Sequence, residues 1–245
     1  MPPLAFITGA TGYTGRHVVR ACMERGVSAV AHVRADSPRL AEWRERFEGM
    51  GATVDATPWE ERAMTATLAR LAPTHVFALL GTTRSRGRRA AREGGGAESY
   101  ETVDYALTAL LLRAAVACGS HPRFVYLSSL GASESTRNAY LRVRGRLERE
   151  VAASGLPYLI VRPSFITGPD REEHRPLERL AAAAADTALA LVASLGARRL
   201  RDRYHSLTGA QLAEGMVRMA MEREGSGVVT GEELRGAAPT SNRGS

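Results

Sequence analysis

Three regularly spaced glycines near the N-terminus constrain the fold more than any other feature of this chain. The apolar run Leu4–Thr8 leads directly into Gly9-x-x-Gly12-x-x-Gly15, and a helix-like segment follows at once. In this context the first glycine permits a tight turn, the second lets the backbone approach a diphosphate, and the third lets the helix pack closely on the strand. The helix N-terminus would present N–H groups and a positive dipole end to the phosphates. We therefore predict that a dinucleotide is held by Gly9, Thr11, Gly12, Tyr13, Thr14 and Gly15.

Short apolar runs alternate with longer helix-like segments beyond this loop. The expected strands are Leu4–Thr8, Ser28–Val33, Ala52–Asp55, His75–Leu80, Arg123–Ser128 and Tyr158–Arg162. The expected helices are Arg16–Arg25, Leu40–Glu48, Glu60–Leu71, Tyr100–Cys118 and Ala139–Ser154. This alternation predicts βαβ units with right-handed crossovers, and hence an α/β fold with a doubly wound parallel sheet. We expect one Rossmann-type domain over residues 1–236, with a small substrate-side portion at 163–236 and a disordered tail at 237–245.

Composition narrows the class of protein. Apolar residues make up 44% of the 245 residues, which is enough for a sizeable core. No apolar run reaches the roughly 18–20 residues that span a bilayer, and the N-terminus lacks the basic start of a signal peptide. Cys22 and Cys118 stand far apart, so we expect reduced thiols and a cytoplasmic location.

The distribution of charged residues and histidines argues against a nucleic-acid site and against a metal site. The net charge of +7 comes from scattered arginines without interleaved aromatic residues. We therefore expect no nucleic acid and no membrane among the partners, and an unidentified small molecule as substrate. Six histidines are scattered without metal-ligand spacing, so we expect no metal site.

The residue that follows the second strand selects between the two nicotinamide dinucleotides. An acidic residue there bonds the ribose hydroxyls of NAD, whereas the planar fork of an arginine suits a 2′-phosphate. This chain has Arg34 at that position and Asp36 two residues further on. We predict NADP as the cofactor, with NAD less favoured; the alternative is that Arg34 is only a solvated charge. Asp55 ends the third strand, where it either faces the adenine or caps a turn.

Five later motifs occur in the order found in one enzyme superfamily. They are Leu80-Gly81-Thr82-Thr83-Arg84, Tyr126–Ala132, Tyr140–Gly145, Val161–Ser164 and Asp170–Pro176. Together with the glycine loop they resemble the atypical short-chain dehydrogenase/reductases, in particular the Tat-interacting-protein oxidoreductases, over about residues 4–220. The resemblance, and the tendency of ligands to bind at the carboxyl ends of strands, imply further cofactor contacts. These are expected from Leu80, Gly81, Thr82, Ser128, Arg162 and Pro163.

The resemblance also implies a set of catalytic residues. In that superfamily a serine after the fifth strand and a Tyr-x-x-x-Lys pair on the next helix do the chemistry. By resemblance, Ser129 would polarise the substrate oxygen and Tyr140 would transfer the proton. Arg144 stands where the superfamily has lysine, and a helix places it on the same face as Tyr140. Arginine keeps the charge that favours a phenolate, but it holds its proton too tightly for a proton relay. The alternative is an ordinary helix pair with a solvated arginine.

Two functions are consistent with this pattern. The first is an NADP-dependent oxidoreductase that acts on a small carbonyl or alcohol. The second is an NADP(H)-binding regulatory or scaffold protein with little or no catalysis, which the arginine in place of lysine favours. We also expect Arg84–Ser99 to be a mobile surface loop. The alternative is that its arginines bind an acidic substrate or a partner. His174 is the one histidine near the expected cleft.

Overall fold

The computed structural model describes residues 2–81, 100–163, 166–167 and 207–236. The predictions made for Thr82, for residues 84–99, for Ser164, for His174 and for the tail 237–245 fall outside these ranges. Within the described ranges the expected alternation of strands and helices is present from Leu4 to Arg162.

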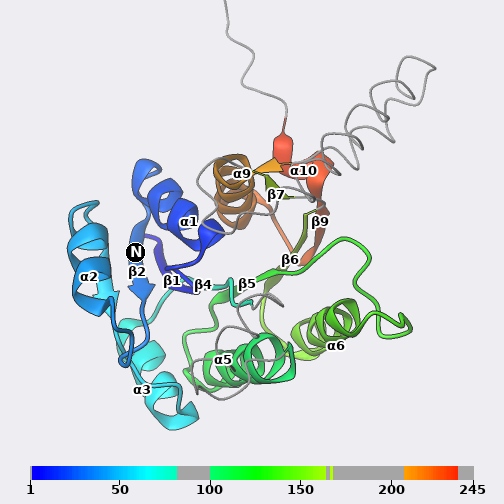
Figure 1. Cartoon of the computed structure of the whole chain (residues 1–245), viewed down its shortest axis with the longest axis horizontal. Helices are drawn as coiled ribbons and strands as arrows, with labels where there is room; N and C mark the ends of the chain where they lie inside the picture. The colour runs from blue at the N-terminus through cyan, green and yellow to red at the C-terminus, as the bar shows by residue number, and fades with distance from the viewer. Residues whose placement is uncertain (1, 82–99, 164–165, 168–206, 237–245) are drawn as a thin grey trace, which may run out of the picture.

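Seven described strands form one parallel sheet in the order β3-β2-β1-β4-β5-β6-β9 (Figure 1). The strands are β1 (Leu4–Thr8), β2 (Ser28–His32), β3 (Thr53–Asp55), β4 (His75–Ala78), β5 (Arg123–Leu127), β6 (Tyr158–Arg162) and β9 (Gly227–Thr230). The strand order reverses between β1 and β4, and ligands of doubly wound sheets bind at such a switch point. A separate short parallel pair joins β7 (Ile166–Thr167) to β8 (Leu207–Thr208). The predicted doubly wound parallel sheet is therefore confirmed.

Helices cover both faces of the sheet in two layers (Figure 1). The first layer contains α1 (Tyr13–Glu24), α2 (Leu40–Glu48) and α9 (Gly209–Glu222), and α10 (Gly231–Arg235) packs on α9. The second layer contains α3 (Glu61–Leu71), α5 (Thr108–Ala117) and α6 (Ala139–Ala153). Because both faces are covered, inner strands such as β1 are apolar along nearly their whole length, and β1 has a polar residue only at its end, Thr8.

The predicted helix Tyr100–Cys118 is one element in the sequence analysis but two in the structure. Residues Tyr100–Leu107 form a π-helix, η1, and a regular α-helix, α5, begins at Thr108. A π-helix has a wider turn than an α-helix, so it changes which residues face the sheet. One consequence is that Asp104, a charged residue, lies on the inner side with no exposed surface.

Candidate functional site

The three glycines of the first loop have different surroundings. Gly9 has a positive φ of 72°, and a Cβ built on it would lie 2.6 Å from the carbonyl oxygen of Leu79, just after β4. A Cβ on Gly15 would overlap the carbonyl of Gly9 and the Cα of Ala10. A Cβ on Gly12 would approach only the Gly9 oxygen, at 3.1 Å, among the described atoms. Gly9 and Gly15 therefore permit close packing. At Gly12, no described atom other than the Gly9 oxygen lies within 4 Å of the added Cβ, so this is the position of the loop that a ligand can approach.

The N-terminus of α1 lies next to Gly12. Gly12 is the N-cap residue, and no side chain of the described residues caps the helix there by a hydrogen bond. The first turn also carries no acidic side chain, so the positive end of the helix dipole is not neutralised from within the helix. This geometry fits the phosphates of a dinucleotide, which take the role of the missing cap.

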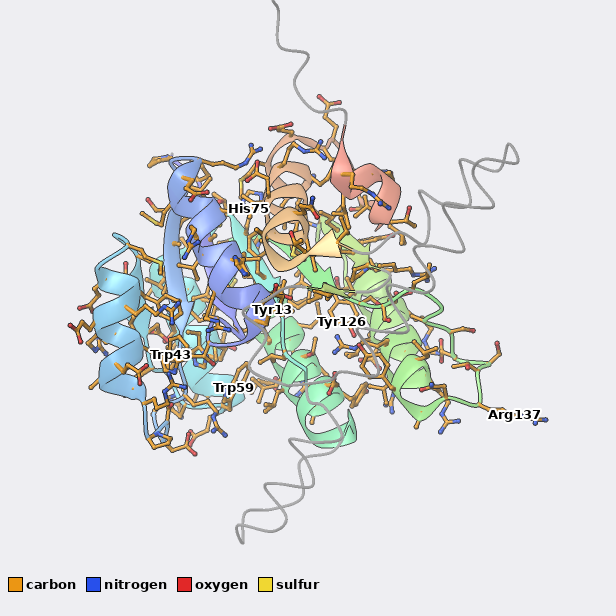
Figure 2. The ribbon with its side chains drawn as sticks, turned by 45° about the horizontal axis from the view of Figure 1, so that its top comes forward. Tyr13, Trp43, Trp59, His75, Tyr126 and Arg137 are labelled. Carbon is orange, nitrogen blue, oxygen red and sulfur yellow. The ribbon has the colours of Figure 1, made fainter. Side chains whose placement is uncertain are left out.

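The side chain of Tyr13 points toward α9 instead of the loop opening. Its hydroxyl accepts a hydrogen bond from the backbone N–H of Gly209 at 3.3 Å, and its ring lies edge-on to His17. A Cβ on Gly209 would overlap the tyrosine ring, so the glycine makes room for it. Figure 2 labels Tyr13 at this end of α1. Tyr13 therefore anchors the loop to α9 through its side chain and leaves only its backbone for a phosphate.

The carboxyl end of β2 presents one arginine to solvent. The Arg34 side chain is 55% exposed, and its Nε lies 3.7 Å from Asp36. Asp55 accepts a hydrogen bond from the backbone N–H of Thr57 at 2.9 Å and lies 4.0 Å from Arg70. Asp55 therefore caps a turn, as one of the two sequence interpretations has it, whereas Arg34 keeps an exposed guanidinium.

Arg144 is the most heavily engaged side chain at the carboxyl edge of the sheet. Its Nη1 donates to the carbonyl of Leu127 at 2.6 Å and to the hydroxyl of Tyr126 at 3.3 Å. Its Nη2 donates to the carbonyl of Leu80 at 3.2 Å and forms an ion pair with Asp104. The alternative interpretation of a solvated arginine is therefore wrong, because only 4% of Arg144 is exposed.

Tyr140 and Arg144 lie on one face of α6, as the four-residue spacing predicts. The guanidinium carbon of Arg144 lies 5.1 Å from the centre of the Tyr140 ring. Burial alone lowers the pKa of Arg144, but attraction to Tyr126, Tyr140 and Asp104 raises it above its ordinary value, so the group stays charged. Burial also raises the pKa of Tyr126, which Arg144 only partly opposes, so Tyr126 stays a neutral phenol.

Ser128 and Arg162 meet in a second buried network, which the sequence did not indicate. The Ser128 hydroxyl donates to Glu148 of α6, and Arg162 donates to the same carboxylate with Nε at 2.9 Å and with Nη2. The carboxylate of Glu148 is nearly buried, so its charge needs the Arg162 partner. The side chains of Ser128 and Arg162 thus join β5, α6 and β6, and they are engaged with each other through Glu148.

Ser129 lies on the segment that follows β5. Its carbonyl accepts from the N–H of Ala132 at 3.1 Å, and the next residue, Leu130, donates to the carbonyl of Pro163 at 2.9 Å. No hydrogen bond of the Ser129 hydroxyl is present within the described residues, and the residue is partly exposed. Its hydroxyl is therefore available to a ligand at this edge.

The glycine loop and the tyrosine–arginine pair lie along one continuous edge of the sheet. Gly9 packs against Leu79 after β4, and a Cβ on Gly81, two residues on, would lie 3.0 Å from Nη2 of Arg144. Arg144 in turn contacts the ring of Tyr140. The structure therefore brings together most of the predicted site residues, and Asp104 and Glu148 are the two charged groups that the sequence analysis missed.

Both cysteines of the chain lie at the C-terminal ends of helices, Cys22 in α1 and Cys118 directly after α5. Cys22 is buried, which raises its pKa to about 12, and Cys118 is partly buried; both are free thiols. In the described ranges, no cluster of three His, Cys, Asp or Glu side chains is arranged to hold a metal ion. No helix there is long and apolar enough to cross a membrane.

A family model described as NAD(P)H-binding matches residues 9–218, and the chain belongs to this family. It is also similar to the protein FMP52, mitochondrial, of Debaryomyces hansenii, with 30% identity over 165 residues that cover 67% of each chain. The protein fmp52 of Aspergillus clavatus is 32% identical over 179 residues, which cover 70% of each chain. The chain is therefore a nicotinamide-dinucleotide-binding protein with a Rossmann-type fold.

Solved structures with the same fold include sugar-nucleotide epimerases. A putative epimerase from Burkholderia cenocepacia superposes with a TM-score of 0.64 at 19% identity, covering 95% of this chain and 79% of that one. UDP-glucose 4-epimerase from Thermus thermophilus, in complex with NAD, gives a TM-score of 0.60 at 15% identity, with 95% and 81% coverage. At this level of identity the likeness establishes the fold alone.

The expected cytoplasmic location is contradicted by the curated relatives. Several of them, including those of Debaryomyces hansenii and Candida albicans, are named as mitochondrial proteins. The expectation rested partly on the cysteines. Two free thiols indicate a reducing compartment, but they do not tell one such compartment from another.

Proposed function

We propose that this protein is an NADP-dependent oxidoreductase that acts on a small carbonyl or alcohol. The observation that carries the proposal is the contact of the Arg144 guanidinium with the Tyr140 ring, on the same sheet edge as the open glycine loop. A tyrosine beside a fixed cation is a suitable proton-transfer group, because the positive charge favours its ionised form.

In the proposed mechanism the protein orients two reactants and moves one proton. The bound dinucleotide supplies the hydride chemistry. The backbone N–H groups at the start of α1 would hold its phosphates, next to Gly12. The Ser129 hydroxyl donates a hydrogen bond to the substrate oxygen, and the Tyr140 hydroxyl gives a proton to that oxygen or takes one from it. Arg144 acts on Tyr140 through its charge, since its Nη1 and Nη2 donors point to Leu80, Leu127, Tyr126 and Asp104.

We propose NADP in preference to NAD because of the charge at the end of β2. Arg34 is exposed there and its fork can pair with the oxygens of a 2′-phosphate. Asp36 lies beside it but is more exposed still, at 79%, so the pair is weak and a phosphate can replace the carboxylate. Calorimetry of the wild type with NADPH and with NADH compares the two cofactors directly.

A second function, an NADP(H)-binding regulatory or scaffold protein, is favoured by one observation. Arg144 is buried and its charge is paired with Asp104, so it is less suited to activating Tyr140 than an unpaired cation would be. Cofactor binding does not depend on that activation. The two functions therefore share a cofactor site and differ only in turnover.

The test is a turnover assay with NADPH and a panel of small aldehydes and ketones. If the oxidoreductase proposal holds, Tyr140→Phe removes turnover and leaves NADPH affinity unchanged, since it deletes only the proton-transfer hydroxyl. The matched control is Tyr158→Phe, because Tyr158 lies at the opposite, amino end of β6. Wild-type turnover that survives Tyr140→Phe rejects the mechanism, and the absence of wild-type turnover across the panel favours the binding protein.

A further inference from the structure

Asp104 has a carboxylate with no exposed surface, and it lies outside the glycine loop. It lies on the π-helix η1, and its side chain forms an ion pair with Arg144 of α6. A charge that leaves water needs a partner of opposite sign and good hydrogen bonds. The two residues are 40 positions apart in the sequence, so the pair exists only because the fold brings η1 and α6 together.

The pair is held against the ends of two strands. Arg144 donates to the carbonyl of Leu80, after β4, and to that of Leu127, at the end of β5. A Cβ on Gly81 would lie 3.0 Å from Nη2 of Arg144 and 3.5 Å from Oδ1 of Asp104, so the glycine backbone sits directly on the pair. The guanidinium therefore cannot turn toward a ligand without losing several hydrogen bonds.

The ionisable groups that act on Arg144 include, among the described residues, Asp104 from η1, Tyr126 from β5 and Tyr140 from α6. Tyr126 is kept neutral by burial, so Asp104 is the group that balances the guanidinium. At low local dielectric an uncompensated charge would act strongly on the adjacent Tyr140 ring.

We propose that Asp104 is a positioning residue of the site, which fixes Arg144 beneath Gly81 and reduces the positive charge that Tyr140 experiences. The proposal rests on the proposed function in taking Tyr140 as the proton-transfer group. The coupling itself is a property of the folded protein and does not require turnover. Removing the Asp104 charge should therefore alter the ionisation of Tyr140 in any case.

The experiment is a spectrophotometric pH titration of tyrosine in the folded protein. The Tyr140 contribution is obtained as the difference between each protein and its Tyr140→Phe counterpart. Asp104→Asn keeps an acceptor oxygen but removes the charge, so Tyr140 should ionise at a lower pH than in the wild type. The control Asp36→Asn removes an exposed carboxylate at the end of β2 and should leave the ionisation of Tyr140 unchanged.

A second variant keeps the test decisive if Asp104→Asn is too unstable to titrate. Loss of one partner leaves a buried charge unpaired, whereas loss of both removes that penalty. Asp104→Asn/Arg144→Gln should therefore melt at a higher temperature than Asp104→Asn alone. If Asp104→Asn is folded and Tyr140 ionises at the same pH as in the wild type, the proposal is overturned. It is also overturned if Asp104→Asn is unfolded and Asp104→Asn/Arg144→Gln is no more stable. A wild type without turnover would count against the proposed function and leave this test intact.

Discussion

Gly12→Val separates the ligand-binding role of the glycine loop from its packing role. Gly12 has a φ of −72° in the extended region, which valine adopts readily. Among the described atoms, the added Cβ would press only on the Gly9 oxygen, 3.1 Å away, so the contact needs a shift of just a few tenths of an ångström. The methyl groups would then occupy the space in front of α1. We expect a folded protein with a nearly unchanged melting temperature and a blocked phosphate site.

The size of the binding defect follows from the hydrogen bonds at that site. A hydrogen bond to a charged group contributes about 1.5–3 kcal/mol, so the loss of one weakens NADPH binding by about 10-fold to 100-fold. Displacement of the diphosphate from the α1 N-terminus removes more than one such bond. The binding is measured by calorimetry and by the thermal shift that NADPH produces.

Gly15→Val is the matched control in the same loop. Its Cβ would lie 2.1 Å from the Gly9 oxygen and 2.7 Å from the Ala10 Cα, an overlap that a small shift of the backbone cannot relieve. This variant should have a lower melting temperature than the wild type even without NADPH, because the defect is in folding and not in binding. The reasoning is refuted if Gly12→Val binds NADPH with wild-type affinity, or if Gly12→Val unfolds while Gly15→Val remains stable.

Two further predictions concern charge. Arg34→Ala should weaken NADPH binding by about 10-fold or more and leave NADH binding nearly unchanged, since only NADPH carries the 2′-phosphate; equal losses for both cofactors in calorimetry would contradict this role. Burial lowers the pKa of His32, whose Nε2–H donates to the carbonyl of Thr57 at 2.8 Å. The neutral form is therefore favoured in the folded state, and stability should fall as pH drops below the unfolded value of about 6.5. Urea unfolding at pH 8 and pH 5.5 measures this effect. The free energy of unfolding should fall less between the two pH values for His32→Gln than for the wild type. An equal fall would show that His32 does not cause the pH dependence.

The first two-thirds of the fold could be predicted because local chemistry and tertiary structure agree there. Apolar runs such as Leu4–Thr8 and Tyr158–Arg162 coincide with β1 and β6, since buried parallel strands need no polar alternation. The elements after Arg162 gave no comparable pattern. Strand β9 has four residues, begins with Gly227 and leaves Val228 40% exposed.

Helix α9 was missed for a different reason. It contains two glycines, and glycine inside a helix normally weakens the prediction of one. The structure explains both of them by close approach. A Cβ on Gly209 would overlap Tyr13, and a Cβ on Gly215 would overlap the carbonyl of Leu234 in α10. Neither constraint can be seen without the packing of α9 against α1 and α10.

The charged network of the site could not be predicted from the sequence, because the residues that form it are distant from one another in the chain. Asp104 stands in a segment that predicts a continuous helix, and the π-helical turn that places it inside is a tertiary result. Glu148 and Arg162 are ordinary surface residue types, and only the fold reveals that Glu148 is buried and paired with Arg162. The one indication in the sequence was Arg144 itself, because a guanidinium in place of an ammonium group calls for more acceptors.

The buried pair of Asp104 and Arg144 bears on cofactor binding and catalysis in opposite ways. A buried ion pair adds little net stability, but it fixes geometry, and here it holds the strand ends after β4 and β5 in one arrangement. That rigidity would benefit a dinucleotide bound across the same edge, whatever the protein does with it. The same pairing reduces the positive field at Tyr140, which an oxidoreductase needs and a binding protein does not. Cofactor affinity should therefore depend on Gly12 and Arg34 and be insensitive to Tyr140, whereas any turnover should depend on all three residues.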